Sequence, residues 1–208
     1  MGKNEDDPMQ RNSRSTIGLA FLATASAMAP AIAFAHPFDS LQGLAAAAVH
    51  PFTGIDHLLA MVAVGLWATH GRNQVEWRLP ATFVSGMTVG AILGAFSVPL
   101  PLVDAGIVLS VLFLGLAIAA GRDMPLAWAA PLIAGFGLIH GHAHGIELLA
   151  GASGLVTGIG FVLSTTALHL IGVAAGLWLA WLPGTSGSGL RRGVGLATVV
   201  AGLMLIVA

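Results

Sequence analysis

Long apolar segments, broken only by short polar or glycine- and proline-rich stretches, run through most of this chain. Of its 208 residues, 56% are hydrophobic and only 8% are charged, and the mean hydropathy is +0.89. Because soluble domains carry roughly 25% charged residues, this composition is typical of a membrane protein. A bilayer offers no partners to open backbone groups, so the spanning segments must be helical. The sequence therefore predicts an all-α polytopic membrane helix bundle, with no basic face for nucleic acid.

The first 35 residues follow the pattern of a secretory signal peptide. A basic polar stretch precedes an apolar run, which ends in an A-x-A cleavage pattern at Ala35. We expect cleavage after Ala35, which leaves 36–208 as a transmembrane domain whose N-terminus lies outside the cytoplasm. The new terminal residue, His36, offers an α-amine and an imidazole that together suit a divalent metal. A solvated terminal histidine is the plainer alternative.

Six apolar segments follow, separated by glycine, proline and charged residues. We place these spans at 54–70, 79–97, 102–120, 126–150, 154–182 and 191–208. With the N-terminus outside, alternation puts three loops in the cytoplasm, at 71–78, 121–125 and 183–193. Every basic residue after the signal peptide falls in them, as the positive-inside rule requires: Arg72, Arg78, Arg122, Arg191 and Arg192. This predicts a multi-pass protein of the bacterial inner membrane with a periplasmic mature N-terminus.

Two clusters of ionisable residues interrupt the apolar segments, and such groups are so costly at membrane depth that they indicate an ion site or pathway. The cluster at the outer end of the first span consists of His50, Asp56 and His57. The cluster in the outer half of the fourth span consists of His140, His142, His144 and Glu147. Both clusters are expected at a similar depth, so we expect them to form a shared site.

Helix geometry selects among the residues of the second cluster. At about 100° per residue, His140, His144 and Glu147 share one helix face, whereas His142 is displaced by about 200°. The chain has no cysteine, so imidazole and carboxylate ligands remain, which suit nickel, cobalt and zinc. Interhelical hydrogen bonding is the alternative role for a histidine in a span. His169, in the middle of the fifth span, would either pass a cation inward or bond to a neighbouring helix.

The two clusters lie in long motifs that resemble a known family. HPFTGIDHLLAMVAVGLWA and HGHAHGIE are similar to the motifs of the HupE/UreJ family, small nickel or cobalt permeases associated with hydrogenase and urease systems. The resemblance covers nearly all of the chain after the signal peptide. One departure is Ile139, where the family often has phenylalanine. The resemblance implies that the functional residues are His50, Asp56, His57, His140, His144 and Glu147. The residues themselves suggest additional, less favoured metal or pathway positions at His36, His142 and His169.

The favoured function is a permease that moves Ni2+ or Co2+ into the cytoplasm, with the ion as cargo and no prosthetic group. The chain has no nucleotide-binding motif, and we expect it not to be an enzyme. The alternative is an intramembrane zinc hydrolase, in which the same ligands hold zinc and Glu147 or Asp56 activates its water. Haem ligation is less favoured, because carboxylates at these depths suit that role poorly. The resemblance also implies a link to hydrogenase or urease maturation.

Overall fold

The computed structural model describes residue 49 and the ranges 52–70, 74–148, 154–183 and 185–207. For 146–148 and 154–155 it describes the backbone alone. The predicted signal peptide, His36 and His50 lie outside these residues. The expected division of the chain at Ala35 therefore stays a prediction.

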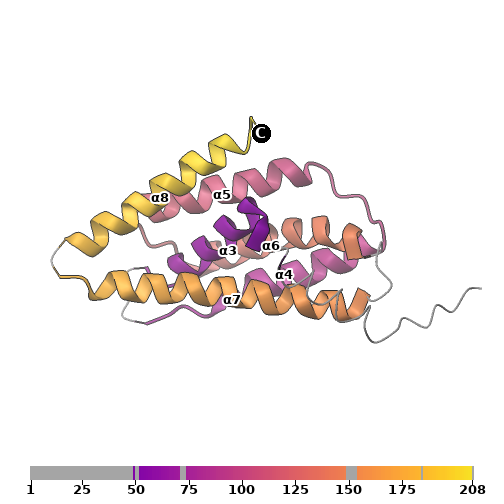
Figure 1. Cartoon of the computed structure of the whole chain (residues 1–208), viewed down its shortest axis with the longest axis horizontal. Coiled ribbons are helices and arrows are strands. Elements are labelled where there is room, and N and C mark those ends of the chain that lie inside the picture. The colour runs from indigo at the N-terminus through magenta and orange to yellow at the C-terminus, as the bar shows by residue number, and fades with distance from the viewer. Residues whose placement is uncertain (1–48, 50–51, 71–73, 149–153, 184, 208) are drawn as a thin grey trace, which may run out of the picture. The chain divides into compact units, whose positions relative to one another are not determined.

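Six helices make up the elements of the described chain, and no strand occurs among these residues. They are α3 Ile55–Trp67, α4 Arg78–Ala95, α5 Val103–Ala120, α6 Leu126–Leu148, α7 Gly154–Trp181 and α8 Ser186–Met204 (Figure 1). The predicted all-α fold is confirmed for the part of the chain that the structure describes. Each helix matches one of the six expected spans, and most ends agree within three residues.

Three of these helices contain stretches that are long and apolar enough to cross a membrane. These stretches are Val103–Ala120, Leu126–Gly145 and Val156–Trp181. Helix α3 is apolar but has only 13 residues. The composition of the described helices thus fits a membrane bundle, whereas six complete spans stay a prediction.

The start of α8 differs from the expectation. The helix begins at Ser186, five residues before the predicted start at 191, because its glycine- and serine-rich first turns pack against α7. A Cβ built at Gly187 would collide with the carbonyl oxygen of Leu179, so the two backbones approach closely. Arg191 and Arg192, expected where the loop 183–193 meets the span 191–208, therefore lie well inside a helix.

The closest helix pair is α4 with α6, where glycines of each helix face the backbone of the other. A Cβ at Gly90 would collide with the carbonyl oxygen of Leu138, and one at Gly141 with that of Met87. The same holds at Gly86, Gly137 and Gly145. Small residues allow such close approach, so these glycines fix the position of α6, which carries the second histidine cluster.

Helix α3 packs in a similar way against α7, and α5 packs against α8. A Cβ at Gly65 on α3 would collide with the carbonyl oxygen of His169 on α7, and one at Gly172 with that of Val62. Gly115 on α5 and Gly195 on α8 also face each other. The residues of the first cluster on α3 therefore belong to the closely packed pair α3–α7, and those of the second cluster on α6 belong to the pair α4–α6.

Candidate metal-ion site

The histidines of α3 and α6 lie in contact. The ring of His57 is 5.2 Å from that of His140 and 4.3 Å from that of His144, measured between centroids. Their exposed fractions are 7% for His57, 0% for His140 and 3% for His144. The structure thus brings together residues of the two clusters, as the expected shared depth of the first and fourth spans required.

The start of α3 places Asp56 and His57 in its first turn. Gly54 precedes the helix in an extended conformation, with φ −79° and ψ 110°. A Cβ at Gly54 would lie 3.0 Å from Oδ1 of Asp56 and 3.2 Å from Nδ1 of His57. A larger residue at this position would therefore crowd the Asp56–His57 pair, and glycine leaves room for it.

Asp56 determines which nitrogen of His57 faces the site. Nδ1 of His57 lies 2.8 Å from Oδ1 of Asp56, and a carboxylate can only accept, so Nδ1–H donates. The second nitrogen, Nε2, then carries the lone pair that binds metals. A carboxylate in this position orients a ligating imidazole and raises its basicity.

His140 and His169 present the same nitrogen for a similar reason. Nδ1 of His140 donates to the carbonyl oxygen of Phe136 at 2.9 Å, and Nδ1 of His169 donates to that of Thr165 at 2.7 Å. In both rings Nε2 is buried and has no hydrogen-bond partner among the described residues. Each ring therefore holds a lone pair that is available to a cation.

His142 faces away from the other histidines of its cluster. Its Nε2 donates to the carbonyl oxygen of Val98, in the segment between α4 and α5, at 2.7 Å. The angular spacing of residues along the helix had predicted that His142 points to a different side from His140 and His144. This hydrogen bond links α6 to the segment that connects α4 and α5, so His142 has a structural role.

Two aromatic residues that the sequence did not single out complete the surroundings. The ring of Phe83 on α4 lies 5.5 Å from that of His140 and 5.1 Å from that of His169. The ring of Phe161 on α7 lies 4.3 Å from that of His144. Both are ordinary apolar residues within apolar segments, so no sequence signal distinguishes them from the rest of the core.

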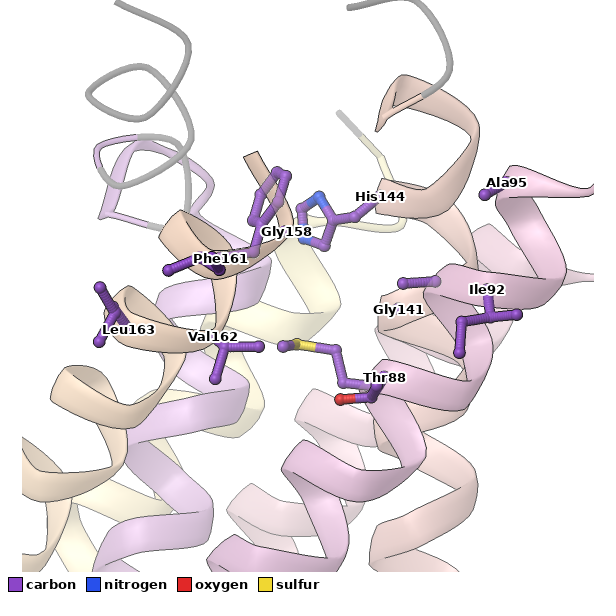
Figure 2. A pocket seen from close by; sticks show the side chains of 12 residues that line it. Thr88, Ile92, Ala95, Gly141, His144, Gly158, Phe161, Val162 and Leu163 are labelled. Carbon is purple, nitrogen blue, oxygen red and sulfur yellow. The ribbon is translucent and has the colours of Figure 1, made fainter. Parts of the chain in front are cut away.

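A cavity of about 430 Å³ reaches His144 from the side, between α4, α6 and α7. Figure 2 shows His144 beside Phe161, with Gly141 and Ile92 on one flank and Val162 and Leu163 on the other. Apolar side chains dominate its lining. Such a cavity suits the apolar interior of a membrane better than a hydrated ion.

Several expected ligands cannot be placed. Glu147 lies within α6, but its side chain is outside the described residues, as are His36 and His50. Within the described ranges, no group of three His, Asp or Glu side chains stands ready to hold a metal ion. Metal binding by the converging histidines therefore stays a prediction.

Comparison with known proteins identifies the family. The family model described as "HupE / UreJ protein" matches residues 22–205. The chain is 40% identical over 198 residues to "Protein HupE" of Rhizobium leguminosarum bv. viciae, covering 94% of this chain and 98% of the relative. No solved structure matches the chain. Nothing in these comparisons supports the zinc-hydrolase alternative. The resemblance carried by the two histidine motifs is confirmed, and the chain belongs to the HupE/UreJ family.

Proposed function

We propose that this protein is a permease of the bacterial inner membrane that carries Ni2+, or Co2+, from the periplasm into the cytoplasm. The observation that carries the proposal is the contact of His57 with His140 and His144, which joins the two histidine motifs in the bundle interior. Buried imidazoles of this number are costly in a membrane unless they serve an ion. Family membership and the thiolate-free ligand set support nickel and cobalt as the cargo.

In this proposal the imidazoles of the site bind the cation, and Asp56 orients one of them. His57 and His140 offer Nε2 to the ion, because an acceptor holds the proton on Nδ1 of each ring. His144 adds a third imidazole. The carboxylate of Glu147 and the imidazoles of His50 and His36 are the further ligands in this proposal.

The inward route in this proposal leads past Phe83 to His169. The ring of Phe83 contacts both His140 and His169, and its side chain is fully buried. The ring must therefore move aside before the ion transfers from one imidazole to the next. Transfer between weak sites allows both uptake and release, because conduction requires binding that is strong enough to capture the ion and weak enough to release it.

The driving force is the membrane potential. The chain carries no nucleotide-binding motif. When a divalent cation moves into a cell with a negative interior, its free energy falls by about 4.6 kcal/mol per 100 mV, twice the value for one charge. The imported ion would then serve the maturation of a hydrogenase or a urease.

Uptake of radiolabelled nickel by cells that express the protein tests this function. We expect uptake by the wild type, competition by unlabelled cobalt, and loss of uptake in His57→Ala and Glu147→Gln at unchanged amounts of membrane-inserted protein. Asp104→Asn is the matched control for Glu147→Gln, because Asp104 is exposed at the start of α5. No uptake by the wild type would contradict the permease function, and full uptake in both site variants would contradict the proposed site.

A further inference from the structure

A second cavity, of about 310 Å³, lies at the other end of α3 from His57. His57 is in the first turn of α3, and His70, which lines this cavity, follows the last turn. At 1.5 Å per residue the two histidines are roughly 20 Å apart along the helix axis. The polar or glycine residues that line the cavity are His70, Gly121, Gly187, Ser188, Arg191 and Arg192.

Arg191 is a buried cation with unused donor capacity. Arg191 is a residue of α8, and it is only 8% exposed. Nη2 donates to the carbonyl oxygen of Gly176 at 2.9 Å. Nη1 is buried and has no hydrogen-bond partner among the described residues. Burying a guanidinium group costs free energy unless an opposite charge compensates it. An anion in this cavity would supply that charge.

Arg192 and His70 add two more groups over the end of α5. Gly121 ends that helix in the left-handed conformation, with φ 61°. A Cβ at Gly121 would lie 3.6 Å from Nε of Arg192 and 3.8 Å from Cε1 of His70. The side chains of Arg192 and His70 therefore lie next to the backbone of Gly121. Because Gly121 has no side chain, space remains between them. Nδ1 of His70 is also buried without a hydrogen-bond partner in the described part of the chain.

The N-terminus of α8 borders the same cavity. Gly187 and Ser188 belong to the first turn of this 19-residue helix and line the cavity. The first amides of a helix lack partners within the helix, and the dipole makes this end positive. A helix N-terminus beside guanidinium groups favours phosphate.

We propose that this cavity binds a phosphate group, carried either by an anionic phospholipid or by free phosphate. Two guanidinium groups and a helix N-terminus match the charge and geometry of phosphate and repel a metal cation. The aromatic residue Trp181, between two residues that line the cavity, is 88% exposed, as aromatic residues at a lipid–water interface are. Basic pockets between membrane helices bind lipid headgroups in this way.

Thermal unfolding of the purified full-length protein in a non-ionic detergent tests the proposal without reference to metal transport. The probes are short-chain phosphatidylglycerol, short-chain phosphatidylcholine and inorganic phosphate. We expect phosphatidylglycerol or inorganic phosphate to raise the melting temperature in a saturable way. A response to phosphate alone identifies the free anion as the source, and a response to phosphatidylglycerol without phosphate identifies the lipid. The proposal would be overturned if neither phosphatidylglycerol nor inorganic phosphate raised the melting temperature. It would also be overturned if the two lipids raised it equally and inorganic phosphate had no effect.

Two variants connect the response to the cavity. Arg192→Gln removes an exposed charge and should weaken anion binding about tenfold, the usual effect of losing one charge-assisted hydrogen bond. Arg191→Lys keeps the buried charge but removes the fork and should weaken binding similarly. Arg78→Gln is the matched control, because Arg78 pairs with Glu76 on the surface and lines neither cavity. Unchanged affinity in Arg192→Gln, or equal losses in Arg192→Gln and Arg78→Gln, would contradict the site.

Discussion

The imidazole rings of His57 on α3 and His144 on α6 lie 4.3 Å apart between centroids, with their planes inclined by 59°. The residues come from two motifs that are distant in the sequence, and each motif sits on a different glycine-packed helix pair. Their contact joins the two motifs into one candidate site.

The Asp56→Asn variant separates the role of orienting His57 from that of a direct ligand. Because Asp56 accepts from Nδ1 of His57, its loss should weaken nickel binding by roughly 10–100-fold. The His57→Ala variant loses the imidazole itself and should weaken nickel binding more than Asp56→Asn does. Calorimetric titration of the purified proteins measures both effects. Equal loss in the two variants would indicate that Asp56 itself ligates the ion.

His142 and His144 form a matched pair on α6, since both are at least 96% buried, with exposed fractions of 4% and 3%. His144→Asn should abolish nickel uptake. His142→Asn should keep uptake but lower the melting temperature, because a buried hydrogen bond to Val98, worth about 1 kcal/mol, is lost. Nickel uptake is measured in cells that express each variant, and thermal unfolding on the protein purified from those cells. The reverse pattern would place His142 in the ion site.

Metal binding should weaken as the pH falls. An imidazole must be neutral to ligate, and an ordinary histidine gains its proton near pH 6.5. Several imidazoles in one site make the dependence steeper than that of a single group. We expect nickel affinity of the purified protein to be high at pH 7.5 and to have dropped more than tenfold at pH 4. Equal affinity at the two pH values would argue against histidine ligation.

The α4–α6 contact predicts opposite effects for two glycines of α6. Gly141→Ala forces a Cβ against the carbonyl oxygen of Met87, which should cost about 1–3 kcal/mol as an overpacking change. Gly135→Ala meets no atom within 4 Å and should be neutral or stabilising by up to about 1 kcal/mol. Thermal unfolding in detergent compares them. Equal stability would contradict the close helix packing.

The sequence predicted those features that periodicity and breakers carry. The predicted span at 126–150 became α6, Leu126–Leu148, because glycine and charged residues bound a long apolar run. Helical spacing also indicated correctly that His142 would face away from His140 and His144. These inferences depend only on neighbours along one helix.

Features that depend on contacts between helices could not be predicted. Phe83 contacts His140 and His169, yet its apolar neighbours in sequence give no hint of this. Arg191 was expected at the boundary between the last loop and the last span, but α8 starts five residues earlier, where Gly187 packs against α7. The resulting burial of an arginine follows from tertiary packing, which the sequence pattern does not encode locally.

X-ray absorption at the nickel edge of the loaded, purified protein tests the central claim most directly. Imidazole rings produce characteristic multiple scattering, so the spectrum reports how many histidines hold the ion. We predict at least two imidazoles in the wild type, and fewer in His57→Ala and in His140→Ala at matched nickel loading. A spectrum without imidazole scattering, or one that is unchanged in both variants, would contradict a nickel site formed by α3 and α6.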